Sequence, residues 1–302
     1  MKHLLKLLDC STDEIKQILD LADQLKYEKK HNIPHPLLAG KSVGLIFQKS
    51  STRTRVSFET GIYQLGGQPL FLSARDLQIG RGEPVQDTAR VLSRYLDGIM
   101  IRTYAQKEVE DLAKMGSIPI INGLTDFCHP CQVLADLMTI REKYGKLAGL
   151  KMCYIGDGNN MANSLIVGGL KMGLNVSIAT PKNYQPAAEV LAFAKENPNF
   201  FLTDDPFEAA VDADIVFTDT WASMGQESEK EERQKAFAGY QVNDALMAVT
   251  KPDAMVQHCL PAYRGQEITE KVFEEHADEI FEEAENRLHA QKAVMVTLMG
   301  NK

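Results

Sequence analysis

Apolar residues recur at helical spacing near the start of the chain. Behind the pattern Ser11-x-x-Glu14, which is typical of a capping box, they return every three or four positions as far as Leu25. A break at 34–40 follows, and the apolar run 42–47 then has the length of a buried strand. Helical spacing returns after this run. The opening stretch therefore predicts a helix, a strand and a second helix.

Strand-like and helix-like segments continue to alternate through both halves of the chain. In the first half we expect strands at 69–72, 98–101 and 118–121, with helices from Pro84 and around 109–115. In the second half we expect strands at 151–155, 176–179, 215–218 and 255–257, with helices between them. Strands that alternate with helices in this way are typical of parallel sheets.

Two long helices stand out from this alternation. One runs from Pro130 to Gly145, and the other covers about 282–302, within and beyond an acidic stretch, 267–285, that we interpret as a solvated helix face. The first is long enough to join two domains. We therefore expect an α/β protein with two doubly wound parallel-sheet domains joined by interdomain helices. The expected domains are 1–140 and 141–302, with the C-terminal helix packing back on the first domain.

Composition and charge narrow the range of partners. A length of 302 residues is enough for two domains that each bury a core. Hydrophobic residues make up 44% and charged residues 25%, so nothing indicates disorder, collagen or a coiled coil. The chain has 33 Lys and Arg against 41 Asp and Glu, and its net charge of −8 repels nucleic acid and anionic membranes. We expect neither as a partner, and an anionic ligand has to be bound by a few concentrated cations.

The chain ends and the cysteines indicate a cytoplasmic protein. Acidic residues from Asp9 onward interrupt the apolar run at the N-terminus, so no export signal is expected. The apolar run 293–299 is too short for a membrane span, which takes about 20 residues. Five cysteines form an odd set without a secretory context, which favours reduced thiols. The seven histidines have no metal-binding spacing, and we expect no metal.

A polar segment between a strand and a helix is the first candidate site. Ligands of open parallel sheets bind beyond the carboxyl ends of the strands. The segment Ser50 to Arg55, with the sequence SSTRTR, lies at such a position. Free backbone N–H groups, the helix dipole, hydroxyls and guanidinium groups all favour an anion there. The segment is predicted to hold phosphate, and the alternative is a helix cap with two surface arginines.

Other donors in the sequence have a meaning that depends on where the fold places them. Arg102 ends an expected strand and Arg287 lies in the last helix, and each alone fits a surface ion pair. His129 and Gln132, in the order His-Pro-x-Gln, open the long helix. An imidazole and a carboxamide there can donate to a carbonyl or a developing oxyanion. These groups make one site only if the fold brings them to Arg53.

The second half offers groups suited to an amine. Asp219 and Cys259 each follow an expected strand. A carboxylate can hold an amino group and a thiol can position one, although a free cysteine is most often a small buried hydrophobe. Segment 156–160, GDGNN, presents two asparagines, and its alternative as a dinucleotide site lacks the third glycine. Cys128 and Cys131 have C-x-x-C spacing, but a redox role would require a depressed thiol pKa.

Together these residues resemble the aspartate/ornithine transcarbamylase superfamily over essentially the whole chain. Segments 51–55 and 129–132 look like the carbamoyl-phosphate and H-P-x-Q motifs of the whole superfamily. Segments 219–225, DTWASMG, and 258–265, HCLPAYRG, look like the more specific motifs of its ornithine branch. The resemblance implies an enzyme that converts carbamoyl phosphate and L-ornithine into L-citrulline and phosphate. It also implies a homotrimer with sites at subunit boundaries, no cofactor, and a place in arginine metabolism, with biosynthesis favoured.

The resemblance assigns site residues position by position. Carbamoyl phosphate is expected to contact Ser51, Thr52, Arg53, Thr54, Gln78, Arg102, His129, Gln132, Cys259, Leu260 and Arg287. Of these, Gln78 would reach the site of a neighbouring subunit. Ornithine is expected to contact Asn160, Asp219, Ser223 and Met224. Domain 1–140 would thus bind carbamoyl phosphate, and domain 141–302 would bind ornithine.

The implied reaction needs a neutral amine, although an alkyl ammonium group such as that of lysine has a pKa of about 10. We expect Asp219 and Cys259 to position this amine. Arg102 and His129 are expected to donate to the carbonyl oxygen as it becomes anionic. Transfer to aspartate, putrescine or an N-acylated ornithine is the nearest alternative, and the sequence 223–225 argues against it. An NAD-dependent oxidoreductase and a ligand-binding module without activity are alternatives of other classes.

Overall fold

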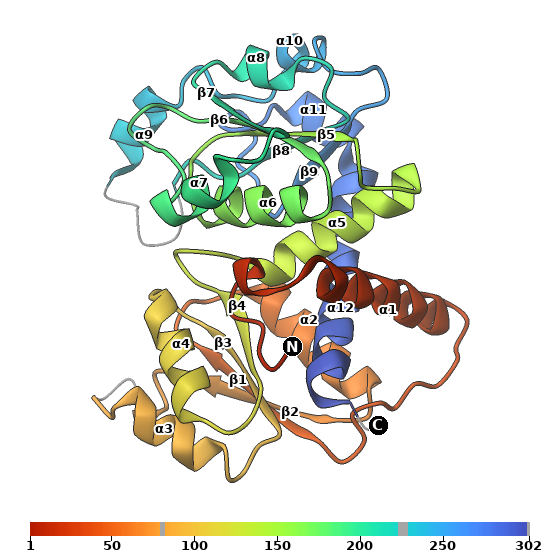
Figure 1. Ribbon diagram of the computed structural model, residues 1–302, viewed down its shortest axis with the longest axis vertical. Helices are drawn as coiled ribbons and strands as arrows, with labels where there is room; N and C mark the ends of the chain where they lie inside the picture. Colours follow the sequence, from red (N-terminus) through yellow and green to blue (C-terminus); the bar gives the residue numbers. More distant parts are fainter. Residues whose placement is uncertain (79–81, 223–228, 301–302) are drawn as a thin grey trace. The chain divides into compact units, whose positions relative to one another are not determined.

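The computed structural model describes residues 1–78, 82–222 and 229–300 of the chain (Figure 1). The chain forms two compact units. Unit 1 comprises Met1–Met138 and Glu285–Lys302, and unit 2 comprises Thr139–Ala284. Each unit contains one sheet, and the paired strands of both sheets run parallel. The expected α/β fold class with two parallel-sheet units is therefore confirmed.

Within its described residues, unit 1 is built on a four-stranded sheet with the order β2-β1-β3-β4. Its strands are β1 (Ser42–Phe47), β2 (Gln68–Ser73), β3 (Gly98–Arg102) and β4 (Ile120–Leu124). A 3-10 turn, η1 (Leu7–Asp9), precedes the helices α1 (Thr12–Lys30), α2 (Thr52–Gln64), α3 (Val85–Leu92) and α4 (Gln106–Met115). Crossovers between parallel strands are right-handed, so α2 covers one face of the sheet while α3 and α4 cover the other (Figure 1).

Two helices are divided between the units. α5 (Pro130–Tyr144) begins in unit 1 and ends in unit 2, and α12 (Ala277–Met299) begins in unit 2 and ends in unit 1. Hydrogen bonds tie the last part of α12 to the other helices of unit 1. Nζ of Lys26 in α1 donates to Oδ1 of Asn286 over 2.7 Å, and Oγ of Ser57 in α2 lies 2.6 Å from the Gln291 amide. Chain ends that are far apart in sequence thus form one helical layer.

Unit 2 contains, over 139–222 and 229–284, a five-stranded sheet with the order β7-β6-β5-β8-β9. Its strands are β5 (Lys151–Ile155), β6 (Asn175–Ala179), β7 (Phe200–Thr203), β8 (Ile215–Thr218) and β9 (Met255–His258). Its helices are α6 (Asn160–Lys171), α7 (Ala188–Ala194), α8 (Pro206–Ala210), α9 (Lys230–Ala236), α10 (Asp244–Met247) and α11 (Glu270–Glu275). By the same handedness, α6 and α7 lie on one face, with α8 and α10 on the other (Figure 1).

Local sequence explains where these elements begin and how they are buried. Oγ of Ser11 accepts from the N–H of Glu14 over 3.1 Å, and Oε2 of Glu14 accepts from the N–H of Ser11 over 2.8 Å, which is the expected capping box. β1, β5 and β8 are buried almost throughout, as their continuous apolar runs predict for sheets covered on both faces. No helix among the described residues is long and apolar enough to cross a membrane.

The structure corrects three expectations. β7 was not expected, because this short edge strand is only partly buried and lacks a continuous buried run. β4 begins at Ile120, after Pro119, whose missing N–H cannot join a sheet ladder. The acidic stretch 267–285 is not a uniformly solvated face, since Glu267 is 0% exposed and Glu283 is 1% exposed. The last helix accordingly begins inside this stretch, where acidic residues complement its dipole.

Candidate active site

The expected phosphate segment lies where the strand order of unit 1 reverses. β1 and β3 are neighbours in the sheet, but the chain leaves β1 toward β2 and leaves β3 toward β4. The loops that follow β1 and β3 therefore diverge, and ligands of open α/β sheets bind at such points. Segment 48–51 leads from β1 into α2, and Arg102 is the last residue of β3. Two of the expected cationic positions thus belong to the same switch point.

The start of α2 combines a helix cap with a free positive dipole. Ser51 is the N-cap residue, and its Oγ accepts from the N–H of Thr54 over 3.2 Å. The first turn, 52–55, contains no acidic residue that would neutralise the dipole. The cap, which was the alternative explanation of this segment, is therefore present. It coexists with a helix end that favours an anion.

Arg287 is hydrogen-bonded to two other expected site residues. It is 3% exposed. Its Nη1 donates to Oε1 of Gln132 over 2.7 Å, and its Nη2 donates to Oγ1 of Thr54 over 3.2 Å. Nε2 of Gln132 in turn donates to Oδ1 of Asp136 over 2.8 Å. Side chains from α2, α5 and α12 are thereby held in one buried network.

Two residues that were not among the expected site residues, Gln291 and Ser57, complete the hydrogen-bond network around Arg287. With its amide oriented to suit its neighbours, Gln291 accepts from Nη2 and Nε of Arg287 at 2.9 and 3.0 Å. The same amide then donates to Oγ of Ser57 at 2.6 Å. Gln291 is 0% exposed and lies one helical turn after Arg287. A glutamine one turn beyond an arginine, beside an apolar helix face, was the signal that could have identified it.

His129 lies immediately before α5, within reach of the charges of three arginines. It is 5% exposed. Burial, together with the positive charges of Arg287, Arg102 and Arg53, lowers its pKa well below the ordinary value of 6.5. The imidazole is therefore neutral at pH 7. Arg102 and Arg287, which each alone fit a surface ion pair in the sequence, are together with Arg53 close enough to one histidine to influence its protonation.

A cavity of about 500 Å³ opens beside the start of α2. Its wall includes Ser50, Ser51, Thr52, Lys49, Arg55 and Arg75. Lys49 was not among the expected site residues, although it is only 5% exposed. It forms an ion pair with Asp126 and lies 4.2 Å from the ring centre of Tyr104. The cavity has the size of a small-molecule site, and its wall combines donors for an anion with apolar side chains such as Phe47, Val56 and Phe71. Arg53, Arg102, His129 and Arg287 are not among its lining residues.

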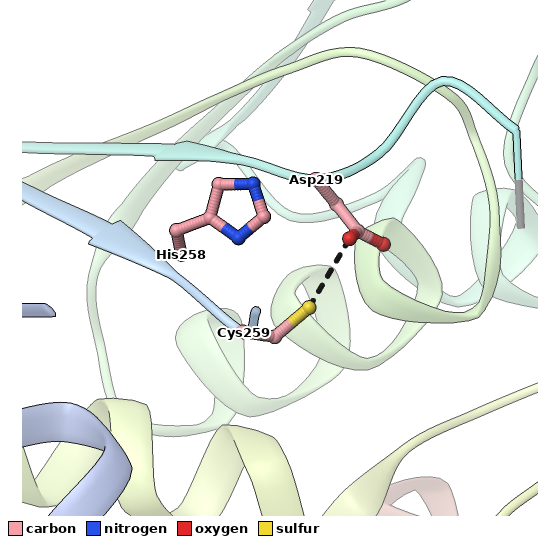
Figure 2. Close-up of side chains that lie close together, drawn as sticks. All are labelled: Asp219, His258 and Cys259. Atoms are coloured by element: carbon pink, nitrogen blue, oxygen red, sulfur yellow. Dashed lines mark hydrogen bonds between the residues drawn. The ribbon is translucent and has the colours of Figure 1, made fainter. Parts of the chain in front are cut away.

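In unit 2 the strand order also reverses, between β5 and β8. Asp219 directly follows β8 and is 7% exposed. Its Oδ2 accepts from Nδ2 of Asn159 over 3.0 Å, and its Oδ1 accepts from Sγ of Cys259 over 3.1 Å and from the N–H of Thr220 over 2.7 Å. Figure 2 shows the thiol directed at the carboxylate. The two residues expected to position the amine are therefore in direct contact.

Asn159 orients Asp219 and was not among the expected site residues. It is the N-cap of α6, and its Oδ1 accepts from the N–H groups of Met161 and Ala162 at 2.9 and 3.3 Å. The cap fixes the amide so that Nδ2 faces Asp219. Asn160, which was expected, is the half-buried first residue of α6. The pair of asparagines was the signal, and only the second was assigned a role.

A buried ion pair lies beside this cluster. Nη1 of Arg233 in α9 donates to Oδ2 of Asp157 over 2.8 Å and to the carbonyl of Trp221 over 3.0 Å, and Nε donates to Glu229 over 2.9 Å. Burial raises the pKa of Asp157 to about 6, although the charge of Arg233 acts against this. Arg233 thus links Asp157, in the loop after β5, to Trp221 and Glu229.

The remaining expected residues either make few contacts with the rest of the site or lie outside the described residues. Gln78 is exposed, and its backbone carbonyl accepts from the N–H of Glu83 over 3.1 Å. Leu260 is half-buried directly after Cys259, with a left-handed φ of 58°. Ser223 and Met224 lie outside the described residues. The structure therefore brings together most, but not all, of the expected site within each unit.

The cluster around Asp219 also has the donor types of a metal site. Ligand atoms of Asp219, His258 and Cys259 lie within 4.8 Å of one another, among the described residues (Figure 2). Each side chain already takes part in hydrogen bonding. Sγ of Cys259 donates to Asp219, and the two ring nitrogens of His258 face the N–H of Leu260 and Oε1 of Glu267. We therefore assign the three to a hydrogen-bonded cluster rather than to a metal site.

Two sequence patterns with alternative functions have structural explanations. Cys128 and Cys131 are 4% and 0% exposed, and burial raises the pKa of each thiol to about 12. This shift is opposite to the one a redox-active C-x-x-C pair needs. At Gly158, a Cβ would come within 2.4 Å of backbone atoms of 184–186. This glycine is therefore required by packing, which removes the reason to assign it to a dinucleotide.

Comparisons with known proteins point to one family. Residues 2–142 match the carbamoyl-P binding domain of aspartate/ornithine carbamoyltransferase, and residues 148–298 match its Asp/Orn binding domain. Ornithine carbamoyltransferase of Caldicellulosiruptor saccharolyticus is 57% identical over 301 residues, which cover 98% of each chain. The same enzyme of Thermococcus kodakarensis is 54% identical over 304 residues, 99% of this chain and 96% of its own. The ornithine carbamoyltransferase structure from Pyrococcus furiosus has a TM-score of 0.94 at 52% identity, covering 99% of this chain and 97% of its own.

The matching domains and the two sites define a carbamoyltransferase, and the chain belongs to the aspartate/ornithine carbamoyltransferase family. The compared relatives are all ornithine carbamoyltransferases. The expected family, the expected enzyme class and the ornithine branch are therefore confirmed.

Proposed function

We propose that this chain transfers the carbamoyl group of carbamoyl phosphate to the side-chain amine of L-ornithine, giving L-citrulline and phosphate. The cationic cluster of unit 1 carries the proposal, because the positive charges of Arg53, Arg102 and Arg287 all act on one buried neutral imidazole. Arg287 is itself held by hydrogen bonds to Gln132 and Thr54. In a chain of net charge −8, such a cluster calls for an anionic ligand. Carbamoyl phosphate offers a charged phosphate for guanidinium groups and a carbonyl oxygen for a neutral N–H donor.

Unit 1 is proposed to bind carbamoyl phosphate. Its phosphate would accept from the N-terminal N–H groups of α2 and from the side chains of Ser51–Thr54, including Arg53. Arg102 and His129 would donate to the carbonyl oxygen. Since His129 is neutral, the positive charge that stabilises the developing oxyanion comes from Arg102. Arg287 and Gln132, already hydrogen-bonded to each other, would fix the substrate's orientation.

Unit 2 is proposed to bind ornithine. The buried carboxylate of Asp219 offers negative charge to the side-chain amine, and its bonds to Asn159 and Cys259 hold it in one orientation. Asn160 lies at the same switch point and offers an amide to the amino-acid end. We also assign Ser223 and Met224 to ornithine binding. Cys259 and Leu260 are proposed to contact both substrates.

The proposed transfer removes two protons from the ornithine nitrogen, forms one C–N bond and breaks one C–O bond. The ornithine ammonium first loses a proton to solvent while Asp219 holds the nitrogen in place. The nitrogen lone pair then forms the C–N bond to the carbamoyl carbon, and Arg102 and His129 stabilise the oxyanion. The C–O bond to phosphate breaks, and the second proton leaves the nitrogen with the departing phosphate, which Arg53 stabilises. No cofactor enters these steps.

We further propose a homotrimer in which Gln78 reaches the site of a neighbouring subunit. Large exposed apolar residues on unit 1 support an interface between copies, since Val56, Tyr63 and Tyr95 are 55%, 76% and 73% exposed. Light scattering should give three times the chain mass, and Gln78→Ala should lower activity without changing that mass. A monomer of full activity would contradict this assembly.

We place the protein in the cytoplasm and in arginine biosynthesis. The five cysteines are free thiols, as expected in a reducing compartment. The relative from Pyrococcus furiosus, 53% identical over 304 residues, and the structure from Campylobacter jejuni, 45% identical with a TM-score of 0.93, are both described as anabolic. Deletion of the gene in its host should therefore create a requirement for citrulline or arginine.

The acceptor assay tests the proposed function directly. Purified protein is given carbamoyl phosphate together with L-ornithine, L-aspartate, putrescine or N-acetyl-L-ornithine in separate reactions. With ornithine we expect equal amounts of citrulline and phosphate, and with the other acceptors a kcat/KM at least about 1,000-fold lower. A preference for another acceptor would contradict the proposal. Binding of carbamoyl phosphate without phosphate release would favour a module without activity.

A further inference from the structure

A buried histidine and glutamate lie behind the segment that presents Cys259. His258 is 1% exposed and Glu267 is 0% exposed, and Nε2 of His258 lies 3.1 Å from Oε1 of Glu267. The backbone N–H of His258 donates to Oε2 of Glu283 over 2.9 Å. Neither His258 nor Glu267 is assigned to either substrate. Two buried acidic side chains are therefore hydrogen-bonded to His258, the last residue of β9.

The hydrogen bonds of His258 fix the protonation of its ring. Nδ1 lies 2.9 Å from the N–H of Leu260, and a backbone N–H can only donate. Nδ1 must therefore be the unprotonated nitrogen. Nε2 carries the proton and donates it to Glu267, whose Oε1 also accepts from the N–H of Tyr263 over 2.6 Å. Glu267 thus selects the one ring tautomer that can accept from Leu260.

The bond to Leu260 supports an uncommon backbone conformation. Leu260 has a φ of 58°, in the left-handed region that residues other than glycine rarely adopt. The residue before it, Cys259, directs Sγ at Oδ1 of Asp219, as Figure 2 shows beside the ring of His258. The Leu260 N–H belongs to the peptide plane between Cys259 and Leu260, so its bond to Nδ1 holds the backbone of Cys259 as well as that of Leu260. Loss of this bond would free that plane and let the Cys259 side chain turn away from the carboxylate. The geometry at the end of β9 therefore depends on the acceptor at Nδ1.

We propose that Glu267 and His258 are positioning residues that set the Cys259–Leu260 turn and thereby aim the Cys259 thiol at Asp219. The pair acts through hydrogen bonds and touches neither substrate. The effect on catalysis rests on the proposed function, because it requires that Cys259 and Leu260 contact the substrates. The effect on the thiol does not, and can be measured without any substrate.

The first test compares two substitutions of Glu267. Glu267→Gln keeps an Oε1 acceptor for both donors, and its NH2 replaces Oε2, an atom without a hydrogen-bond partner among the described residues. Glu267→Met has similar volume and no strong acceptor. We expect Glu267→Met to raise the KM for ornithine by about tenfold or more, whereas Glu267→Gln stays within about threefold of the wild type. Equal kinetics of the two variants would overturn the proposal.

The second test separates the two bonds of His258. In His258→Asn, Oδ1 takes the place of Nδ1 and can accept from Leu260, while the bond to Glu267 is lost. In His258→Gln, Nε2 takes the place of the ring Nε2 and can donate to Glu267, while the acceptor for Leu260 is lost. Both variants remove most of the ring, so their stabilities should fall together. We expect His258→Gln to show the larger rise in ornithine KM, and the reverse order would count against the assigned roles.

Alkylation of Cys259 gives a readout that is independent of turnover. Cys259 is half-buried while the other four cysteines are buried, so iodoacetamide should modify it first in the ligand-free protein. A thiol no longer held on Asp219 should react faster, and we expect an increase of about fivefold in Glu267→Met and in His258→Gln but not in their matched variants. Altered alkylation in a protein that does not use ornithine would uphold the positioning role while refuting the proposed function. Unchanged alkylation in all four variants, each shown to be folded by circular dichroism, would refute the positioning role itself.

Discussion

The candidate sites of the two units are built for opposite charges. In unit 1 the charges of three guanidinium groups act on one neutral histidine, whereas unit 2 presents a buried carboxylate to which an amide and a thiol donate. The first suits a phosphate and the second suits an amine. The overall charge of −8 therefore does not determine what this chain binds, because a few buried groups set the local field.

The two sites also differ in how their groups are held. In unit 1, Thr54, Gln132 and Arg287 come from three helices and meet through side-chain hydrogen bonds. In unit 2, Asp219 and Cys259 follow neighbouring parallel strands and meet at the edge of one sheet. We therefore expect a substitution of a residue proposed to contact one substrate alone, such as Arg53 or Asp219, to change the kinetics of that substrate and to leave those of the other nearly unchanged.

The largest effect is expected from Arg53→Ala. This substitution removes a charged donor for the departing phosphate and should lower kcat/KM for carbamoyl phosphate by about 1,000-fold. Initial rates of citrulline formation at saturating ornithine measure it. Arg90→Ala makes the same change of charge at an exposed position and should stay within about twofold of the wild type. Near-normal saturation by carbamoyl phosphate in Arg53→Ala would contradict the assignment of the cationic cluster to carbamoyl-phosphate binding.

A smaller effect, confined to the other substrate, is expected from Asp219→Asn. Loss of the carboxylate charge should lower kcat/KM for ornithine by about 100-fold, because the amine loses its charged partner. The KM for carbamoyl phosphate should change by less than about threefold. Asp244→Asn, at an exposed carboxylate, is the matched control. Equal losses for both substrates would show that the two sites are not separable.

Cys259→Ser should have an intermediate effect on the same substrate. A hydroxyl can still donate to Asp219, but its shorter bond displaces the donor, and we expect the KM for ornithine to rise by about tenfold. Steady-state kinetics at saturating carbamoyl phosphate would measure the change. Cys10→Ser, a buried cysteine of unit 1, should leave this KM unaltered. An unchanged response to ornithine in Cys259→Ser would refute its positioning role.

The smallest effect concerns a buried cation of unit 1 that lies outside the substrate cluster. Lys292 is 0% exposed, and its Nζ lies 2.6 Å from Nε2 of His35 and 3.2 Å from Oε1 of Gln64. Burial, followed by the charge of Lys29, lowers its pKa from 10.5 to about 8. Between these values the unfolded chain binds more protons, so the free energy of unfolding contributed by Lys292 rises with pH.

Lys292→Met should remove this rise. Urea titrations should show a difference in pH dependence of about 1–2 kcal/mol between wild type and variant as the pH goes from 8 to 10. Lys107→Met, at an exposed lysine, should keep the wild-type dependence. Parallel curves for wild type and Lys292→Met would show that unit 1 buries this cation without cost.

The sequence predicted the fold better than it predicted the network of contacts. Periodicity alone placed β1, β5 and β8 at their observed bounds, because continuous apolar runs flanked by turns have few other uses. The edge strand β7 had no such run. Segment SSTRTR was found because a polar loop between strand and helix has a physical reason to bind anions.

The sequence did not predict which distant side chains come together in the fold. Arg102 and Arg287 had the same local signal as any surface arginine, and only the fold shows that both influence His129. Glu267 was grouped with a solvated acidic stretch, because charge runs are usually exposed and burial is a tertiary property. Asn159 was named only as one of two asparagines in 156–160 and was given no role of its own, because its cap and its bond to Asp219 depend on the loop conformation.

The central claim is that opposite charges in the two units receive the two substrates. A crystal structure with carbamoyl phosphate and L-norvaline, which is ornithine without its reactive amine, tests it most directly. We predict phosphate oxygens within hydrogen-bond distance of the N–H groups of 52–54 and of the Arg53 guanidinium, and the end of the norvaline side chain beside Asp219 and Cys259. Phosphate bound away from the start of α2, or norvaline bound away from Asp219, would contradict the account.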